Sequence, residues 1–340
     1  MMFRFAFIVA SLGAAVLAKE GYYTTDTAKQ EFMFNQFLRE YGRSYDSTEY
    51  PKRLQIFVNN LKLIDERNLK EKGSAKHGIT QFADMSQDEF KKTHLTATSN
   101  SEKQASADGF HKVLDKVEYT GRLNSVDWSG VYTTPVKDQG YCGSCWAFSA
   151  TEQLESDAMR VLGTNDLLSV EQTNQCTQYA VGGGCRGGMT ESAYRYMRTS
   201  GGLVRDSDYP YTQKTYEGVT GECEVDTSQD ILAITGYTTL RGEENMANYM
   251  ITTGPLSVCV AAEVWNTYRE GVLETCPGSV DHCVQAVGVD TSKTNGYWKV
   301  RNSWGTRWGE SGYIRLAYGE NTCKITDDPT FVEPIRARSQ

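Results

Sequence analysis

The apolar and polar positions divide the first third of the chain into three stretches with different patterns. An almost wholly apolar run covers residues 5–17. Residues 27–72 are polar and helix-prone, and they carry an apolar face, which predicts amphipathic helix. Residues 97–109 are rich in Ser, Ala, Asn and Gly and contain few apolar residues. We therefore expect an exposed linker there.

The rest of the chain changes from a helical to a β pattern. Helix is expected around residues 145–161, and an irregular Gly-rich stretch follows at 182–188. From Ile231 onward, short runs of β-branched and aromatic residues alternate with turn signals, which predicts strands. The clearest runs are 256–261, 283–289, 297–302 and 312–316. The pattern predicts a helical half followed by a β half.

The N-terminal apolar run has the features of a secretory signal peptide. Arg4 supplies a basic residue ahead of the run, and Val16 and Ala18 suit a cleavage site. We therefore place the cut after Ala18. The run is too short for a membrane-spanning helix. We expect a soluble product of the secretory route, either extracellular or held in a lysosome or digestive vacuole.

Net charge and cysteine content narrow the class of protein. The formal net charge of −8 argues against a nucleic-acid or membrane-surface binder. All nine cysteines lie between Cys142 and Cys323, and the secretory route is oxidising enough for disulfides. Because nine is an odd number, one free reactive thiol beside eight other cysteines is expected.

Cys145 is the first candidate for catalysis. It precedes an apolar run expected to open a helix, and the positive end of a helix favours a thiolate, so a lowered pKa is expected. A cysteine nucleophile also needs a base, a group that orients the base, and donors for an oxyanion. Of the four histidines, only His282 follows residue 121, at 137 positions (145 to 282) beyond Cys145. A zinc site at residues 142–145 would need two more ligands nearby.

Two short motifs resemble those of the papain-like cysteine proteases. The first is the string Cys-Gly-Ser-Cys-Trp at residues 142–146, which is a local signature of the nucleophile in papain and the cathepsins. The second is Asn-Ser-Trp-Gly at residues 302–305, with Trp-Gly again at 308–309. Both lie in the order that this family has along its chain.

A helix face upstream of these motifs resembles a propeptide motif of cathepsin L-like zymogens. Spacings of 4, 4, 3, 4 and 4 place six residues on one side of a helix. They are Glu49, Arg53, Phe57, Asn60, Ile64 and Asn68. A second propeptide motif follows at Gly78, Thr80, Phe82 and Asp84, where the family usually has Asn at the position of Thr80. The resemblance implies an inhibitory propeptide that covers the active site.

The resemblance implies an α+β, two-domain papain-like fold with the active-site cleft between the domains. One domain would be helical and the other β-barrel-like, with an α-helical propeptide before them. The expected segments are a signal peptide at 1–18, a cathepsin L-type propeptide at 19–121 and the mature peptidase at 122–340. The mature chain would begin near residues 119–123. We expect this conversion at about pH 4–5, where paired carboxylates become protonated.

The resemblance assigns one residue to each catalytic role. Cys145 would be the nucleophile and His282 its imidazolium partner. Asn302 would accept the imidazole N–H, and Trp304 would shield that bond from water. Gln139 would bind the oxyanion together with the backbone N–H of Cys145. The implied reaction is hydrolysis of peptide bonds as an endopeptidase, with no metal and no cofactor.

Substrate-binding residues and disulfides are also implied by the resemblance. The substrate-binding positions are Gly187, Gly188, Met189, Thr190, Cys259, Val280, Cys283, Trp304 and Asp328. The implied disulfides are Cys142–Cys185, Cys176–Cys223 and Cys276–Cys323. For the remaining pair, Cys259 and Cys283, we expect two free buried thiols, with a fourth disulfide as the alternative.

Asp328 lies where the family places the floor of the S2 pocket. A carboxylate there would pair with an Arg or Lys side chain at P2 of the substrate. The alternative is a solvated acidic turn, since Asp327, Asp328 and Pro329 also have the composition of a loop.

Two further functions fit the same motifs. A Cys-His acyl transferase or peptide ligase on the same fold would use the same residues, and a catalytically silent secreted binding protein would usually lack one of them. Exopeptidase variants need features this chain lacks, namely a histidine pair on an inserted loop or a propeptide cysteine. The expected partners are protein and peptide substrates, the propeptide as an intramolecular inhibitor and cystatin-type inhibitors. We expect a monomer without nucleic-acid or membrane partners.

Overall fold

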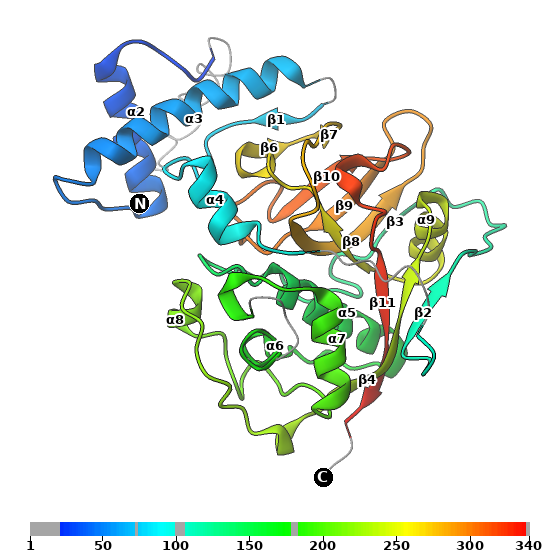
Figure 1. Cartoon of the computed structure of the whole chain (residues 1–340). Helices are drawn as coiled ribbons and strands as arrows, with labels where there is room; N and C mark the ends of the chain where they lie inside the picture. Colours follow the sequence, from blue (N-terminus) through cyan, green and yellow to red (C-terminus); the bar gives the residue numbers. More distant parts are fainter. Residues whose placement is uncertain (1–20, 72–73, 99–105, 178–182, 338–340) are drawn as a thin grey trace, which may run out of the picture.

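The computed structural model describes residues 21–71, 74–98, 106–177 and 183–337 (Figure 1). The expected signal peptide and part of the expected linker lie outside these ranges. Within them, no helix combines the length and the apolar character needed to cross a membrane. The α+β class is confirmed, and a helical upstream region precedes a helical half and a β half.

Two helices and a short third helix make up the upstream region. Its elements are α2 (Thr27–Tyr41), α3 (Tyr50–Lys70), β1 (Lys76–His77) and α4 (Gln87–His94). Pro51 lies in the first turn of α3, where its missing N–H has no helical partner to lose. Phe57 and Ile64 of α3 pack with Phe34 and Phe37 of α2 in a core separate from the rest of the molecule.

The polar residues of the predicted α3 face hold the following segment in place. The guanidinium of Arg53 donates two hydrogen bonds to the carboxylate of Glu89, each with an N···O distance of 2.9 Å. Asn60 donates to two backbone carbonyls, those of residues 83 and 85, at 2.8 Å each. Asn68 exchanges hydrogen bonds with the backbone of His77. The polar side chains on this face of α3 therefore hold residues 77–89 in place instead of pointing to solvent.

The downstream chain begins with a helical half, drawn in green in Figure 1. Its elements are α5 (Cys145–Leu162), α6 (Val170–Cys176), η1 (Gly184–Arg186), α7 (Thr190–Thr199), α8 (Gln213–Tyr216) and η2 (Thr227–Gln229). Helix α5 is buried along most of its length and packs against α6, α7 and the sheet. It therefore lies at the junction of the two halves.

The β half is built on a nine-stranded sheet. Its order is β2-β4-β11-β5-β8-β9-β10-β7, with β3 paired to β8. The strand bounds are β2 His111–Leu114, β3 Ser125–Asp127, β4 Leu232–Leu240, β5 Leu256–Val260, β7 Val272–Leu273, β8 His282–Asp290, β9 Tyr297–Arg301, β10 Tyr313–Ala317 and β11 Thr330–Arg336. The remaining elements are β6 (Tyr268–Glu270), α9 (Glu243–Thr252), η3 (Trp265–Thr267) and η4 (Thr322–Lys324). Helix α9 was not expected within the β pattern.

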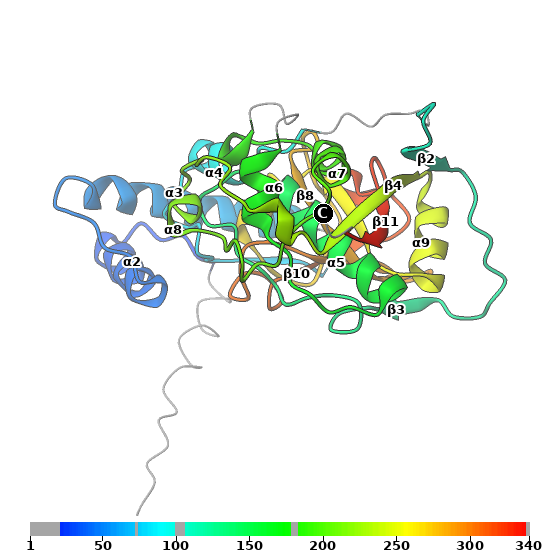
Figure 2. The same ribbon diagram turned by 90° about the horizontal axis from the view of Figure 1, so that it is seen from below.

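The upstream region crosses the whole molecule. Figures 1 and 2 show α2 and α3 at one end and β2 at the opposite end, with α4 between them. Strand β1 pairs with β6 of the β half, and β2 pairs with β4 in a parallel arrangement. Arg67 of α3 is partly buried and donates to the side chains of Asn266 and Thr267 at 2.6 and 2.7 Å. The upstream region is thus docked at several separate points.

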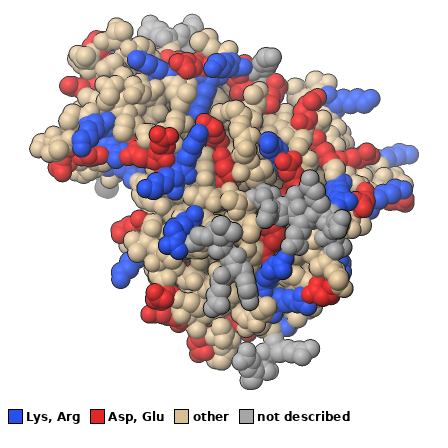
Figure 3. Space-filling view, viewed as in Figure 1, with Lys and Arg blue, Asp and Glu red and all other residues tan. Residues whose placement is uncertain are grey.

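Charged side chains of both signs are distributed over the surface. Figure 3 shows Lys and Arg interspersed with Asp and Glu over the face seen in Figure 1, and neither sign covers a continuous area of that face.

Candidate active site

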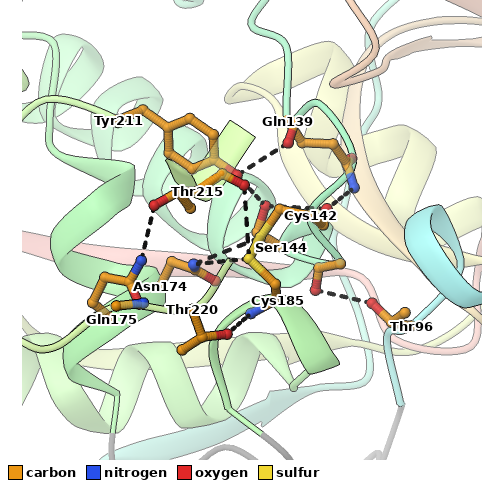
Figure 4. Close-up of a disulfide and its surroundings, with 12 residues drawn as sticks. Thr96, Gln139, Cys142, Ser144, Asn174, Gln175, Cys185, Tyr211, Thr215 and Thr220 are labelled. Carbon is orange, nitrogen blue, oxygen red and sulfur yellow. Dashed lines mark hydrogen bonds between the residues drawn. A yellow bond between two sulfur atoms is a disulfide. The ribbon is translucent and has the colours of Figure 1, made fainter. Parts of the chain in front are cut away.

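Cys145 is the first residue of α5, where the sequence places it. The preceding residue, Ser144, hydrogen-bonds the hydroxyl of Tyr211 at 2.8 Å, which anchors the turn that enters the helix (Figure 4). Cys145 has no exposed surface in this structure. It is the single free cysteine among the described residues. Its thiol packs against Cys283, the residue that follows His282 in β8.

His282 is held in one orientation by a side-chain amide. Its Nε2 lies 2.8 Å from Oδ1 of Asn302, which directly follows β9. The same oxygen accepts the backbone N–H of Ser303 at 2.8 Å, so the amide presents its oxygen to the ring. Nε2 therefore carries the proton, and Nδ1 has no hydrogen-bond partner among the described residues. This leaves one ring nitrogen free to accept a proton.

Trp304 covers the hydrogen bond between His282 and Asn302. The Trp304 ring stacks on the imidazole with centroids 4.8 Å apart and an interplanar angle of 25°. Trp265 meets the imidazole edge-on from another side, at 5.9 Å. Both tryptophans are fully buried, so water has no access to the bond through them. A hydrogen bond in such a dry environment is stronger than one in water.

Hydrogen bonds hold the side-chain amide of Gln139 at both its nitrogen and its oxygen. Its Nε2 donates to the backbone carbonyl of Cys142 at 2.8 Å, as Figure 4 shows, and its Oε1 accepts the Ser303 hydroxyl at 2.6 Å. Its backbone carbonyl accepts the Tyr211 hydroxyl at 3.1 Å. The amide is therefore fixed, and one of its two N–H groups stays unused by these contacts.

Residues 96–98 of the upstream region lie across the cleft between the two halves. Thr96 donates its hydroxyl to the carbonyl of Gly143 at 2.9 Å, and the N–H of Thr98 donates to Gly188 at 3.1 Å, both on the helical side. Between them, the N–H of Ala97 donates to the carbonyl of Asp281 on the β side at 3.0 Å. These contacts join the upstream chain to both walls.

The expectation of an exposed linker is wrong at its first residue. Ala97 is buried, and its methyl group belongs to the same cluster as Cys145, Cys259 and Cys283. Local composition gives no sign of this, because a small residue suits both a flexible linker and a narrow cleft. The segment that follows, 99–105, lies outside the described residues.

Two glycines allow the upstream chain to approach so closely. A Cβ added to Gly187 would lie 2.1 Å from the carbonyl oxygen of Thr96, and Gly187 also has a φ of 106°. A Cβ added to Gly143 would lie 2.3 Å from the hydroxyl of Thr96. Both distances are too short for any side chain. The Gly-rich stretch therefore permits backbone approach at this point, as its sequence suggested.

Cys145 and His282 are both neutral in this covered state. Burial raises the pKa of Cys145 to about 11, although the backbone N–H groups of Cys283 and Trp146 act in the opposite direction. Burial lowers the pKa of His282 to about 4, against the effect of its bond to Asn302. The expected lowering of the Cys145 pKa is therefore wrong for this state. The reason is that the upstream segment removes water from the site.

The three implied disulfides are present, and a fourth accompanies them. The pairs are Cys142–Cys185, Cys176–Cys223, Cys276–Cys323 and Cys259–Cys283. The expectation that Cys259 and Cys283 are free thiols is wrong. They are directly opposite each other in antiparallel β5 and β8, with Cα atoms 4.0 Å apart. Side chains of opposite residues in such a pair lie on the same face and in contact.

The other expected substrate-binding positions lie at the start of α7 and near the cleft. Met189 precedes α7 and Thr190 opens it, directly after Gly188. Val280 packs against the cluster of Cys145. Asp328 is only 2% exposed, so the alternative of a solvated turn is wrong.

Glu191 is a buried neighbour of Asp328 that sequence reasoning did not single out. Both oxygens of Asp328 and one of Glu191 have no hydrogen-bond partner among the described residues. Burial first, and the charge of Glu191 second, raise the pKa of Asp328 well above its usual range. The Asp328 carboxyl group is therefore harder to ionise than a carboxyl group in water.

Comparison with protein families separates the chain into two matched regions. Residues 123–332 match the family described as papain family cysteine protease. Residues 34–90 match the cathepsin propeptide inhibitor domain (I29). The first match contains Cys145, His282 and Asn302, and the second contains the α3 face.

Curated proteins and solved structures agree with both matches. The chain is 35% identical over 325 residues to cysteine proteinase 1 of Dictyostelium discoideum, covering 88% of this chain and 91% of that protein. It is 37% identical over 305 residues to a cathepsin L-like proteinase of Fasciola hepatica, covering 86% and 90%. The solved structure of digestive procathepsin L2 proteinase from Tenebrio molitor larval midgut has a TM-score of 0.78 at 29% identity, covering 89% of this chain and 99% of that one.

Proposed function

Because this chain belongs to the papain family of cysteine proteases and is a cysteine endopeptidase with an inhibitory propeptide, we propose that Cys145 and His282 are its catalytic pair. Asn302 orients the imidazole, and Gln139 binds the oxyanion. The observation that carries this assignment is the fixed imidazole: Nε2 is bound to Asn302, and Nδ1 is left unpartnered.

The proposed reaction begins when the propeptide leaves the cleft. Water then returns to Cys145 and His282, and the thiol proton moves to Nδ1 to give a thiolate and an imidazolium. The thiolate attacks the carbonyl carbon of the substrate, and the carbonyl oxygen becomes an oxyanion. The backbone N–H of Cys145 and the free N–H of Gln139 stabilise that oxyanion. No metal or cofactor takes part in these steps.

The second half of the reaction returns the enzyme to its starting state. The imidazolium of His282 donates its proton to the leaving amine, which separates from the acyl-enzyme. The neutral imidazole then accepts a proton from water as the water attacks the thioester. Cys145 leaves as a thiolate, and the two groups again form an ion pair.

Replacing Asn302 with alanine is expected to lower kcat/KM by about 10²-fold. Without its Oδ1, the Nε2–H of His282 is buried and unpaired, and the ring loses its fixed orientation. The pH profile of kcat/KM measures the effect, because loss of orientation also shifts the titration of His282. Asn124→Ala, an exposed amide far along the chain, is the matched control. Equal kinetics for Asn302→Ala and wild type would contradict the assignment.

We place the segment boundaries and the location as the sequence predicts them. The signal peptide comprises residues 1–18, the propeptide 19–121 and the mature enzyme 122–340. The enzyme belongs to the secretory pathway, as an extracellular, lysosomal or digestive-vacuole protease of protein and peptide substrates. Cystatin-type inhibitors are proposed partners. The N-terminal sequence of the secreted zymogen and of the activated enzyme tests both boundaries.

Asp328 is proposed to give the S2 pocket an acidic floor, together with the other substrate-binding positions named above. A buried carboxylate whose oxygens have no hydrogen-bond partner in the described part of the chain is suited to an Arg or Lys side chain at P2. Because the pKa of Asp328 is raised, its charge and this preference should weaken as the pH falls.

Asp328→Ala is expected to reduce the preference for Arg over Leu at P2 by about 1–3 kcal/mol. Ratios of kcat/KM for two substrates that differ only at P2 measure this change, at neutral and at acidic pH. The neighbouring Asp327 is exposed and provides the matched control, Asp327→Ala. An unchanged Arg-to-Leu ratio in Asp328→Ala would show that the carboxyl group does not contact P2.

A further inference from the structure

The Cys259–Cys283 disulfide lies directly against the residue proposed as the nucleophile. Cys145, Cys259 and Cys283 form one buried cluster, completed by Ala97 and Val280. The backbone N–H of Cys283 also faces the Cys145 thiol. Three sulfur atoms, one of them a thiol and two of them bonded, are therefore packed together beside His282.

The geometry of the sheet accounts for this arrangement. Cys283 follows His282 in β8, and its partner Cys259 lies opposite it in β5. The register also places Val260 opposite His282. The two bridged cysteines are therefore the next residue pair along β5 and β8. Helix α5 packs on β8, which brings its first residue, Cys145, to the same point.

We propose that the Cys259–Cys283 disulfide is an internal exchange partner of Cys145, able to silence the mature enzyme reversibly. The Cys145 thiolate attacks the sulfur of Cys283, a Cys145–Cys283 bond forms, and the Cys259–Cys283 bond breaks. The electron pair of the broken bond goes to Cys259, which takes the proton held by His282. The step needs no external oxidant, since one disulfide and one thiol are present before and after it.

The proposal rests on the proposed role of Cys145 and gives that residue a second reaction. We assign the attack to Cys283 because the backbone N–H of that residue contacts the Cys145 thiol. The product has no free nucleophile and cannot cleave peptides. A small thiol reductant reverses the exchange by attacking the new disulfide, so activity depends on the redox poise of the surroundings.

The propeptide prevents this exchange in the zymogen. Thiol–disulfide exchange requires a thiolate, and Cys145 is a neutral, fully buried thiol while residues 96–98 occupy the cleft. Ala97 also fills the space beside the three sulfur atoms. The disulfide is therefore maintained until activation, when the thiolate and the disulfide are first exposed to each other.

The test follows the position of one free thiol in the mature enzyme. The concentration of active sites in the reduced mature enzyme is first measured by titration with an epoxide inhibitor of cysteine proteases in the presence of thiol. The enzyme is then kept at neutral pH without thiol and without oxygen, quenched in acid, alkylated with N-ethylmaleimide under denaturing conditions and mapped by mass spectrometry. We expect the maleimide label to move from Cys145 to Cys259, together with a peptide pair linked through Cys145 and Cys283.

The loss of inhibitor-titratable sites should equal the linked fraction, and added dithiothreitol should restore all of them. The zymogen, treated in the same way, should keep its label on Cys145. The Cys259→Ser/Cys283→Ser double variant should keep all of the inhibitor-titratable active sites that it had before the thiol was removed. These two controls do not depend on each other, so poor folding of the double variant leaves the test intact.

Two results would overturn the proposal. One is a label that stays on Cys145 in every mature wild-type molecule. The other is an equal loss of titratable sites in the double variant, which would assign the loss to another modification of Cys145. The initial titration separates this failure from that of the proposed function. If the inhibitor does not label Cys145 under reducing conditions, the catalytic assignment itself is wrong.

Discussion

Replacement of Cys145 by alanine is expected to lower kcat/KM for peptide hydrolysis by roughly 10⁴- to 10⁶-fold. The thiolate is the only group in the site that can form the acyl-enzyme, and neither His282 nor Gln139 can replace it. Steady-state cleavage of a peptide substrate by the activated protein measures the loss. Activation of the variant is supplied in trans by wild-type enzyme, because the variant cannot process itself.

The control for this variant is its fold. The zymogen of Cys145→Ala should keep its four disulfides and its melting temperature, since alanine removes only one sulfur atom from a buried cluster. His282→Ala should show a comparable loss, and the double variant should lose little more, because the pair acts as a unit. Turnover close to wild type in Cys145→Ala would refute the proposed mechanism.

Acid is expected to release the propeptide in large part through His94, which by itself weakens the docking about 50-fold between pH 6.5 and pH 4.5. Burial lowers the pKa of the docked His94 to about 3. The released histidine has the ordinary value of about 6.5. The docked state therefore binds fewer protons, so its stability is complete above pH 6.5 and falls as the pH drops below that value.

The surroundings of His94 explain why it resists protonation. Its ring is packed among the aromatic rings of Phe82, Phe90 and Trp304, with centroids 4.8, 5.2 and 6.0 Å away, and Tyr141 closes another side. The charged or titratable groups that face it are the imidazole of His282 and the guanidinium of Arg43, and both disfavour a cation. Its Nδ1 hydrogen-bonds the neutral hydroxyl of Thr93 at 2.7 Å.

Carboxylates contribute at lower pH than His94 does. Burial favours the neutral form of Glu89, but the hydrogen bonds from Arg53 outweigh it and lower the pKa. The stability that Glu89 provides is lost only as the pH falls below about 4.5. Burial raises the pKa of Asp84, so acid acts on that group in the opposite direction. Conversion at about pH 4–5 stays a prediction, with His94 as its first step.

Amide hydrogen exchange in the full zymogen measures this release. Cys145→Ala prevents self-cleavage, and the N–H groups of Ala97 and Thr98 report docking directly because they donate to Asp281 and Gly188 across the cleft. Their protection factors should fall steeply from pH 6.5 to 4.5. In the His94→Gln background the fall should be shallower, and His282 accounts for the part that remains, because burial in the docked state also lowers the pKa of His282. The same slope in both backgrounds would assign the pH dependence to other groups.

Local pattern was sufficient for several of the helices and strands. The α3 face was predicted because helical spacing is a property of a short stretch of chain, and every polar residue on it forms the contacts of a docked motif. The four strands expected after residue 255 appear within two residues of their predicted bounds. Cys145 at a helix start and His282 at a strand start follow from the same local signals.

Long-range register was beyond the sequence. Cys259 and Cys283 form a disulfide because β5 and β8 pair with those two residues opposite each other. A shift of one residue in that pairing would turn the two side chains to different faces. Spacing along the chain carries no information about such a register, which is why the sequence led to the wrong expectation of two free thiols.

The protonation state of the site was likewise decided only by tertiary structure. The helix start at Cys145 predicts a lowered pKa, but in this structure the propeptide residue Ala97 packs beside Cys145 and burial raises the pKa of the thiol. His94 and Asp328 have unremarkable sequence contexts, and burial among residues far along the chain shifts the pKa of each. The sequence by itself therefore determines which titratable group stands at each position. The pKa of that group also depends on how far it is desolvated, and desolvation depends on all the residues that the fold packs around the group.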